Sequence, residues 1–296
     1  MRVVVTGASG HIGLPVVEDL VGAGHEVVGL ARSDDSAARI QAAGGAVRRG
    51  DLDGLDGLRA AAGEADGVIH LAFKHELMAT GEMDAAIAAD MAATQAFGDA
   101  LAGTGKAFVN TSGTLMLAMM GLDRTGTEDD RSPGGHRADV ENATLALADR
   151  GVRSAVVRLS PFVHSDLDKH GFGPILIGIA RDKGFAGYPG EGTNRLPGVH
   201  TRDAARLYRL AVESAPAGQV LHGVGDEGVR TKEIAEAIGR GTGLPVRSVP
   251  AEETEAYFGF LTFALLADNP TSNAKTRELL GWEPTHPDLI ADYDAG

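Results

Sequence analysis

The chain has no cysteine, so it has no disulfide framework, no thiol nucleophile and no thiolate metal site. Cations are also scarce: 27 lysines and arginines stand against 41 aspartates and glutamates, which gives a formal net charge of −14. This charge argues against a nucleic-acid partner, because phosphate binding needs a basic face. Aromatic residues make up only 5 % of the chain, and the four tyrosines are Tyr188, Tyr208, Tyr257 and Tyr293.

Long apolar runs are absent too. No segment approaches the roughly 18 uninterrupted apolar residues of a membrane span, and residues 1–7, MRVVVTG, read as a strand rather than as a targeting segment. We therefore expect no membrane contact and a cytoplasmic location. The 296 residues, 43 % hydrophobic and 23 % charged, suit one α/β domain with a smaller appended lobe.

The first 160 residues alternate between short β-rich runs and longer helical stretches. The expected strands are Val3–Thr6, Glu26–Ala31, Ala46–Arg49, Gly67–Ala72, Ala107–Thr111 and Ser154–Leu159. The expected helices are His11–Ala23, Asp35–Ala43, Leu55–Ala62, Met83–Leu101 and Arg137–Asp149. Apolar strands separated by helices indicate a parallel sheet covered on both faces. We predict an α/β fold, a doubly wound parallel Rossmann sheet with a smaller C-terminal substrate lobe, and ligands at the carboxyl ends of the strands.

The rhythm breaks after Ser160. Residues 161–197 are rich in glycine and proline and read as loops with one helix near Ile175–Lys183, whereas residues 199–213 again read as a strand and a helix. Thr231–Arg240 reads as a helix opened by an N-cap threonine, and Val246–Val249 as a short strand. We expect residues 1–160 to form the Rossmann domain, with 199–221 returning to it. The substrate lobe should consist of residues 161–198 and 222–296.

Residues 6–13, TGASGHIG, place three glycines between the first strand and the first helix. The spacing is G-x-x-G-x-x-G rather than the commoner G-x-G-x-x-G. The first glycine permits a tight turn, the second lets the backbone approach a pyrophosphate, and the third lets the helix pack closely, while the helix N-terminus offers free N–H groups. We expect this loop to hold a dinucleotide through Gly7, Ser9, Gly10, His11, Ile12 and Gly13.

Three further motifs follow in order: DLDG at 51–54, HLAF at 70–73 and NTSGT at 110–114. Together with the glycine loop they resemble the short-chain dehydrogenase/reductase superfamily. The tail TSNAKTRELLGWEP, residues 271–284, resembles the closing motif of its extended, epimerase-like branch. The resemblance implies that Asp51 and Leu52 lie along the adenine. It also implies that Leu71, Ala72 and Phe73 pack beside the ribose and nicotinamide; a simple turn role for Asp51 stays open.

The end of the second strand selects between two cofactors. NAD-binding proteins of this fold place an acidic residue there to bond the ribose 2′-hydroxyl. This chain has Ala31 at that point, followed by Arg32 and Ser33, whose guanidinium and hydroxyl suit a 2′-phosphate. Asp34 and Asp35 better suit the start of the next helix. We therefore expect NADP(H) as the cofactor, with a merely solvated Arg32 as the alternative.

Members of the superfamily carry Tyr-x-x-x-Lys on the helix after the fifth strand, where the tyrosine transfers a proton. Residues 131–141, RSPGGHRADVE, contain no tyrosine, and counting back from the sixth strand puts Arg137 near the lysine position and Pro133 near the tyrosine position. The resemblance places Ser112 where the family's substrate-orienting hydroxyl lies, beside Thr111 and Thr114. Ordinary capping of a strand end is the alternative for Ser112.

Other groups could replace the tyrosine or contact substrate, and an ordinary surface or helix role is the alternative for each. His136 is adjacent to the expected position and titrates near neutrality, whereas Lys74 and His75 follow HLAF and should overhang the nicotinamide. Tyr188 lies in the lobe over the pocket, and Arg195 resembles an extended-family arginine that binds an anionic substrate group. HSDLDKH at 164–170 lacks the i, i+4 histidine pair of a zinc helix, so we expect no metal site.

Together these features predict an atypical extended short-chain reductase that uses NADP(H) for hydride transfer to or from a small carbonyl, imine or activated alkene. We expect a small-molecule substrate as partner, no nucleic acid and no membrane, and consider a homodimer. Two alternatives stay open. One is a sugar-nucleotide epimerase or dehydratase, which the missing tyrosine disfavours, and the other is a catalytically silent NADP-binding sensor or regulatory protein.

Overall fold

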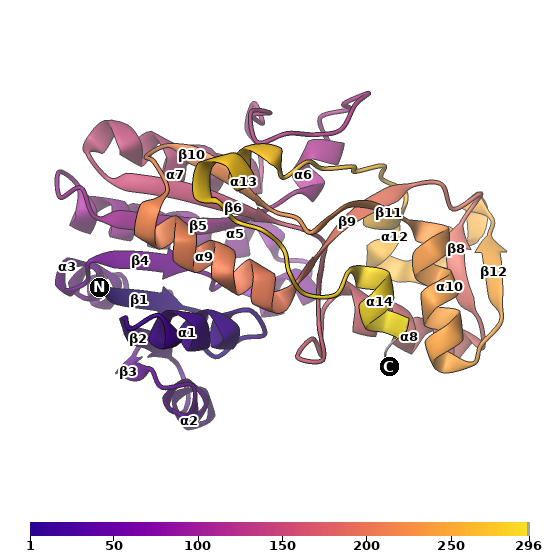
Figure 1. Cartoon of the computed structure of the whole chain (residues 1–296), viewed down its shortest axis with the longest axis horizontal. Helices are drawn as coiled ribbons and strands as arrows, with labels where there is room; N and C mark the ends of the chain where they lie inside the picture. Colours follow the sequence, from indigo (N-terminus) through magenta and orange to yellow (C-terminus); the bar gives the residue numbers. More distant parts are fainter. Residues whose placement is uncertain (295–296) are drawn as a thin grey trace.

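The computed structural model describes residues 1–294 and centres on a seven-stranded parallel sheet of order β3-β2-β1-β4-β5-β6-β10 (Figure 1). The strands are β1 (Arg2–Thr6), β2 (Glu26–Ala31), β3 (Ala46–Arg49), β4 (Gly67–His70), β5 (Ala107–Gly113), β6 (Arg153–Leu159) and β10 (Gln219–Gly223). The predicted doubly wound α/β Rossmann fold is confirmed. Among the described residues, no helix has both the length and the apolar character needed to cross a bilayer.

Helices cover both faces of this sheet. One face carries α1 (Gly13–Gly22), α2 (Asp34–Ala42) and α9 (Thr201–Ser214), and the other carries α3 (Leu55–Glu64), α5 (Met83–Leu101) and α7 (Arg137–Ala146). Side chains of one strand alternate between the two layers: Val3 and Val5 join the α1–α9 core, whereas Val4 joins the α3–α5 core. The strand order reverses between β1 and β4, so the crevice for a ligand opens at their carboxyl ends.

A second, smaller lobe lies beyond these carboxyl ends (Figure 1). It holds the sheet β11-β9-β7 and the pair β12-β8. Its strands are β7 (Phe162–His164), β8 (Ala186–Pro189), β9 (Arg195–His200), β11 (Asp226–Arg230) and β12 (Val246–Val249). Its helices are α8 (Phe172–Lys183), α10 (Thr231–Thr242), α11 (Thr254–Phe258), α12 (Thr262–Leu265) and α14 (Leu289–Asp294). These elements share one apolar core that includes Phe162, Leu176 and Ile234, and we propose that the domain boundary follows it.

The remaining elements connect the layers. They are α4 (His75–Ala79), α6 (Leu115–Ala118), α13 (Ala274–Leu280) and the 3-10 turns η1 (Leu147–Arg150), η2 (Ala251–Glu253) and η3 (Gly259–Leu261). The predicted N-cap of α10 is wrong: Arg230 is the N-cap, its backbone N–H donates to the Glu233 carboxylate at 3.1 Å, and Thr231 Oγ1 is buried without a partner. Strand β5 also runs past the predicted Thr111 to Gly113, because Ser112 and Gly113 still pair with β6.

Candidate functional site

The glycine loop packs tightly against the segment that follows β4. Gly7 has a φ of +67°, and a Cβ built on it would lie 2.9 Å from the backbone nitrogen of Ala72. A Cβ on Gly13 would lie 2.0 Å from the Gly7 carbonyl oxygen, which already accepts a 2.9 Å bond from the Gly10 N–H. Side chains at these positions would therefore clash with the backbone, so only glycine allows this close packing of the loop. We call this loop the glycine cradle. Helix α1 has neither a side-chain cap nor an acidic first turn, so its N-terminus is free to bind an anion.

His11 joins the glycine loop to the start of α9. Its Nε2 lies 2.9 Å from the Thr201 hydroxyl oxygen, and its Nδ1 lies 3.7 Å from Asp168 in the loop after β7. Burial lowers the pKa of His11 although Asp168 opposes this shift. Ile12 packs against the α1–α9 core, and Ser9 stays in the loop. The predicted dinucleotide loop thus contacts the elements that lead into the second lobe.

Thr6 at the end of β1 holds the loop after β4 in place beside the crevice. Its hydroxyl oxygen accepts bonds of 3.2 Å from the N–H groups of both Leu71 and Ala72. The same oxygen lies 2.5 Å from Nδ1 of His70, whose Nε2 lies 3.2 Å from Asp90 in α5. Because a carboxylate only accepts, a neutral His70 carries its proton on Nε2 and receives the Thr6 hydroxyl proton at Nδ1.

The sequence reasoning missed His70 and Asp90, although His70 begins the HLAF motif. Both side chains are buried, at 1 % and 3 % exposure. The available signal was an acidic residue on the apolar face of α5, in line with the buried Ala86 and Phe97. Charged side chains are almost never buried unless they are paired, so such a position indicates a partner.

At the other end of the crevice, guanidinium groups cluster beside β2 and β3. Arg32 donates to Glu76 at 3.1 Å, and both side chains are more than half exposed. Arg49, which the sequence reasoning did not select, is paired with Ala31 in the sheet and contacts Asp34. Ser33 caps α2 by accepting a 3.1 Å bond from the Ser36 N–H. This corner therefore offers two guanidinium groups, those of Arg32 and Arg49, and both are paired with exposed carboxylates.

Asp51 and Leu52 serve local structure. The Asp51 carboxylate accepts 3.0 Å bonds from the N–H groups of Asp53 and Gly54, and so holds the turn that begins α3. Leu52 is 8 % exposed and packs in the α3–α5 core. The turn role of Asp51, left open by the sequence, is therefore present, and its contact with adenine stays a prediction.

Arg137 brings three distant segments together. It begins α7, its guanidinium carbon lies 4.2 Å from the centre of the Phe73 ring, and its Nη2 donates to the Thr111 carbonyl oxygen at 3.2 Å. The same nitrogen lies 4.0 Å from the buried Asp90 carboxylate. The Thr111 hydroxyl donates to the His70 carbonyl at 2.8 Å. Arg137, Phe73 and Thr111, predicted separately, thus form one wall at the carboxyl ends of β4 and β5.

The two predicted hydroxyl groups after Thr111 have different surroundings. Ser112 is 7 % exposed, and its Oγ lies 3.5 Å from Sδ of Met116 in α6. Thr114 is fully buried and its Oγ1 accepts a 3.3 Å bond from the Asn269 amide. Thr114 therefore fastens the C-terminal segment to β5, whereas Ser112 lies closer to the crevice surface.

The candidate proton donors are dispersed. His136 is exposed and has a φ of +51°, the one positive value outside glycine among residues 1–294. Such a backbone costs on the order of 1–3 kcal/mol and is often found at active sites. The Lys74 ammonium bonds both oxygens of Asp53, at 2.7 and 2.8 Å. Burial, aided by the Arg137 charge, lowers the pKa of His75, so its ring is neutral at neutral pH.

None of the four tyrosines belongs to the segment before α7. Tyr188 lies in β8, where the Lys232 ammonium stands 5.7 Å from its ring centre. Tyr208 of α9 is fully buried against Thr111, 2.8 Å between hydroxyl oxygens, and burial raises its pKa. Tyr257 donates to the Phe185 carbonyl, and burial raises the pKa of Tyr293. Each phenol is therefore held in the sheet–helix layers or in the second lobe.

Arg195 at the start of β9 is already paired. Its Nε and Nη2 donate to the two oxygens of Asp268 at 3.0 and 2.7 Å, and its backbone N–H donates to the same carboxylate at 2.8 Å. An anionic substrate group would have to compete with Asp268 for this guanidinium. The contact of Arg195 with such a group stays a prediction.

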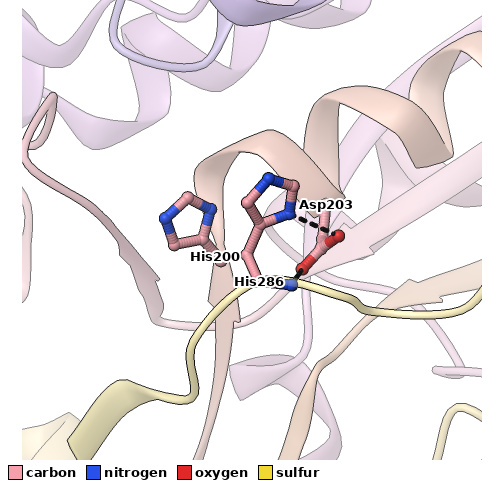
Figure 2. Close-up of side chains that lie close together, drawn as sticks. All are labelled: His200, Asp203 and His286. Carbon is pink, nitrogen blue, oxygen red and sulfur yellow. Dashed lines mark hydrogen bonds and ion pairs between the residues drawn. The ribbon is translucent and has the colours of Figure 1, made fainter. Parts of the chain in front are cut away.

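His200, Asp203 and His286 form a compact group at the start of α9 (Figure 2). The Asp203 carboxylate accepts bonds from the backbone N–H groups of Thr285 and His286 and lies 2.9 Å from Nδ1 of His286. The rings of His200 and His286 stack at 4.6 Å with an interplanar angle of 7°. Parallel rings direct their lone pairs side by side rather than at one point, so the group suits a clasp for residues 285–286 better than a metal site.

Comparisons with known proteins agree with this geometry. The NAD dependent epimerase/dehydratase family model matches residues 3–222. An uncharacterized protein of Schizosaccharomyces pombe is 44 % identical over 99 % of this chain and 98 % of its own length. The 3-diazoavenalumate denitrifying reductase of a Streptomyces species is 29 % identical over 97 % of both chains.

Among solved structures, DesIV of Streptomyces venezuelae, a dTDP-glucose 4,6-dehydratase with NAD bound, shares the fold with a TM-score of 0.77. It is 19 % identical and the match covers 100 % of this chain and 95 % of that one. The glycine cradle and the free helix N-terminus described above fit a nicotinamide dinucleotide at the switch-point crevice. The chain belongs to the NAD dependent epimerase/dehydratase family.

Proposed function

We propose that this protein is an NADP(H)-dependent reductase that transfers hydride to or from a small carbonyl, imine or activated alkene. One observation carries the proposal: the wall formed by Arg137, Phe73 and Thr111 supplies a cation and polar groups, but the segment before α7 supplies Pro133 and His136 in place of a phenol. A site of this composition can position a cofactor and a polarised double bond without the usual tyrosine.

The corner at β2 supports NADP(H) over NAD(H). Arg32 follows Ala31, and its exposed pair with Glu76 is of the kind worth about 0–1 kcal/mol. A charge-assisted bond to a 2′-phosphate is worth roughly 1.5–3 kcal/mol, so the phosphate should displace the carboxylate. Arg49 adds a second guanidinium beside the same strand ends.

Within the site, the chain's residues would orient the cofactor and the substrate and exclude water, and would not themselves react. The N-terminus of α1 and the glycine loop would hold the pyrophosphate, and Arg137, fixed by Asp90 and the Thr111 carbonyl, would stand beside the nicotinamide ribose. The bound cofactor would supply or accept the hydride. Ser112 would bond the reacting oxygen or nitrogen. A protonated imine brings its own proton, whereas a carbonyl would take one from water or from His136.

The epimerase or dehydratase alternative is favoured by the family description and by the dehydratase with the same fold. Both reactions begin by oxidising an alcohol, and a base must remove the hydroxyl proton. A reductase is 29 % identical over 97 % of this chain and a UDP-glucose 4-epimerase 26 % identical over 99 %, so the missing phenol, not the resemblance, favours reduction. An NADP-binding sensor remains a third candidate and predicts binding without turnover.

Two measurements test the proposal. Calorimetric titration of the wild type, Arg32→Ala and Arg39→Ala with NADPH and NADH should give a loss of about ten- to a hundredfold in NADPH affinity for Arg32→Ala alone. Arg39 is the matched control, an exposed arginine at the end of α2. Equal losses for both nucleotides, or tighter NADH binding by the wild type, would overturn the NADP assignment.

The second measurement is turnover. NADPH oxidation should be screened over ketones, imines and enones with product analysis, in parallel with UDP-glucose and dTDP-glucose. We expect reduced products from the first group. Conversion of a sugar nucleotide would establish the epimerase or dehydratase alternative, and tight NADPH binding without any product would favour the sensor.

A further inference from the structure

We infer that the substrate has an apolar body without a phosphate group, and that this body lies against α6 and the segment 260–266. The inference rests on the proposed function, because it names the substrate class for the same site. It is carried by two uncharged stretches of chain that meet beside Ser112 and leave large apolar side chains in water.

The first stretch is α6 and its flanks. Residues 113–122, GTLMLAMMGL, contain no charged side chain in a chain that is 23 % charged. Helix α6 follows β5 directly, and Met116 Sδ lies 3.5 Å from the Ser112 hydroxyl oxygen. Met119, three residues further, is 76 % exposed. The element beside the orienting serine therefore offers flexible thioethers, which adapt to apolar ligands of different shape.

The second stretch is η3 and α12. Residues 256–267, AYFGFLTFALLA, are again uncharged. Leu261 and Leu265 are buried in the core of the second lobe, whereas Phe260, Phe263 and Leu266 are 64 %, 60 % and 48 % exposed. The three exposed residues recur at intervals of three and so share one side. A helix that is apolar on all sides is normally buried on all sides, so this exposed side needs an occupant.

The two stretches are neighbours. Leu115 of α6 packs against the core cluster that contains Leu261 and Leu265. The Asn269 amide donates to Thr114 at the start of α6, and Gly126 forms a β-bridge with Thr271. Figure 1 shows α6 between the end of β5 and α12. The exposed Met119 and the exposed side of η3 and α12, which together we call the apolar patch, therefore belong to neighbouring segments, and the first of these segments contacts Ser112 through Met116. This link to Ser112 favours a substrate over a second copy of the chain.

A phosphate-bearing substrate fits this surface poorly. Transfer of a charged group out of water is costly unless a partner compensates it, and neither uncharged stretch offers a cation. The predicted anion ligand Arg195 donates both side-chain bonds to Asp268. An aromatic or aliphatic ketone, imine or enone would instead gain affinity from each methylene that it buries on the patch.

Calorimetry with product-like alcohols tests the substrate class without turnover. The full chain saturated with NADP⁺ is titrated with ω-phenylalkanols of one to five methylenes. We expect affinity to rise about fourfold per methylene, the factor that burial of one methylene gives, and UDP-glucose not to compete. The double variant Phe260→Ser, Phe263→Ser should flatten this increment, whereas Leu279→Ser, an exposed leucine on α13, should keep it.

Three results would overturn the inference: affinity independent of chain length, displacement of the alcohol by UDP-glucose, or an increment unchanged in the double variant. Sedimentation velocity adds a fourth. If the double variant converts a dimer to a monomer and leaves the affinity for the alcohol unchanged, the patch is an interface between two copies of the chain. Failure of the proposed function is distinct: it would appear as no NADPH oxidation with any carbonyl, imine or enone, whatever the alcohols do.

Discussion

His222 should control how the stability of the fold depends on pH below neutrality. It lies in β10, fully buried, with Nδ1 2.7 Å from the Ser272 carbonyl oxygen and Nε2 3.4 Å from Nη1 of Arg158. A guanidinium only donates, so a neutral ring with its proton on Nδ1 satisfies both partners. Burial, and to a smaller extent the Arg158 charge, lower the pKa of His222 to about 4.

The sign and size of the effect follow from this pKa. In the unfolded chain His222 binds a proton at a pKa of about 6.5, so between pH 6.5 and 4 the unfolded state binds more protons than the folded state. The free energy of unfolding therefore falls as the pH drops through this window, and it is unaffected by His222 above it. A shift of about 2.5 units at about 1.4 kcal/mol each amounts to roughly 3 kcal/mol, lost by pH 4.

Urea unfolding between pH 4.5 and 7.5 measures this loss, with Trp282, the single and fully buried tryptophan, as the fluorescent probe. His222→Asn keeps a donor for the Ser272 carbonyl but cannot take up a proton. The variant should be less stable at pH 7.5 and approach the wild type as the pH falls, because the carboxylates titrate alike in both proteins. His170→Asn, at an exposed position, is the control. Parallel curves for wild type and His222→Asn would refute the reasoning.

Three further predictions concern the crevice. Gly10→Val should abolish NADPH binding in calorimetry, because a branched side chain would stand where the pyrophosphate must approach the backbone. The melting temperature should change little, because a Cβ on Gly10 meets only the Gly7 carbonyl oxygen, at 3.1 Å. The control Gly22→Val, whose Cβ has open space around it, should bind NADPH normally. Ser112→Ala should lower kcat about tenfold with saturating NADPH, the value of roughly one hydrogen bond, and a fully active variant would remove Ser112 from the site. Tyr188→Phe should retain kcat. A large loss of kcat in this variant would mean that the second lobe supplies the proton donor.

The fold was largely predictable because its signals are local. Strands such as Glu26–Ala31 and Ala46–Arg49, and the helix Met83–Leu101, have the predicted bounds, since buried parallel strands and amphipathic helices differ in the period of their apolar residues. The N-cap of α10 was not predictable from residue type. Thr231 is a good N-cap, but Glu233 caps Arg230 one position earlier, and the packing of the second lobe decides between them.

The site was predictable only where sequence neighbours build it. The glycine loop follows from spacing, because Gly7 and Gly13 contact each other's immediate surroundings. The wall around Arg137 does not follow from spacing, because its partners Phe73, Thr111 and Asp90 come from the loop after β4, from β5 and from α5. Residue type indicated a cation at this position, and only the topology of the parallel sheet supplies its carboxylate and its ring.

The predicted cations also differ in how firmly carboxylates hold them. A cation that already has a strong carboxylate partner is a weaker candidate for binding a ligand than its residue type alone indicates. In a chain with a net charge of −14, Arg32, Lys74 and Arg195 all have acidic partners. Arg195 is held by three bonds to Asp268, one of them from its own backbone, so an anionic ligand would have to replace a preformed bidentate pair. Arg32 has a single exposed bond to Glu76, which a bond to the proposed 2′-phosphate would outweigh. Exchange of a carboxylate for an incoming anion should therefore be easier at Arg32 than at Arg195, and the contact of Arg195 with an anionic substrate group stays a prediction.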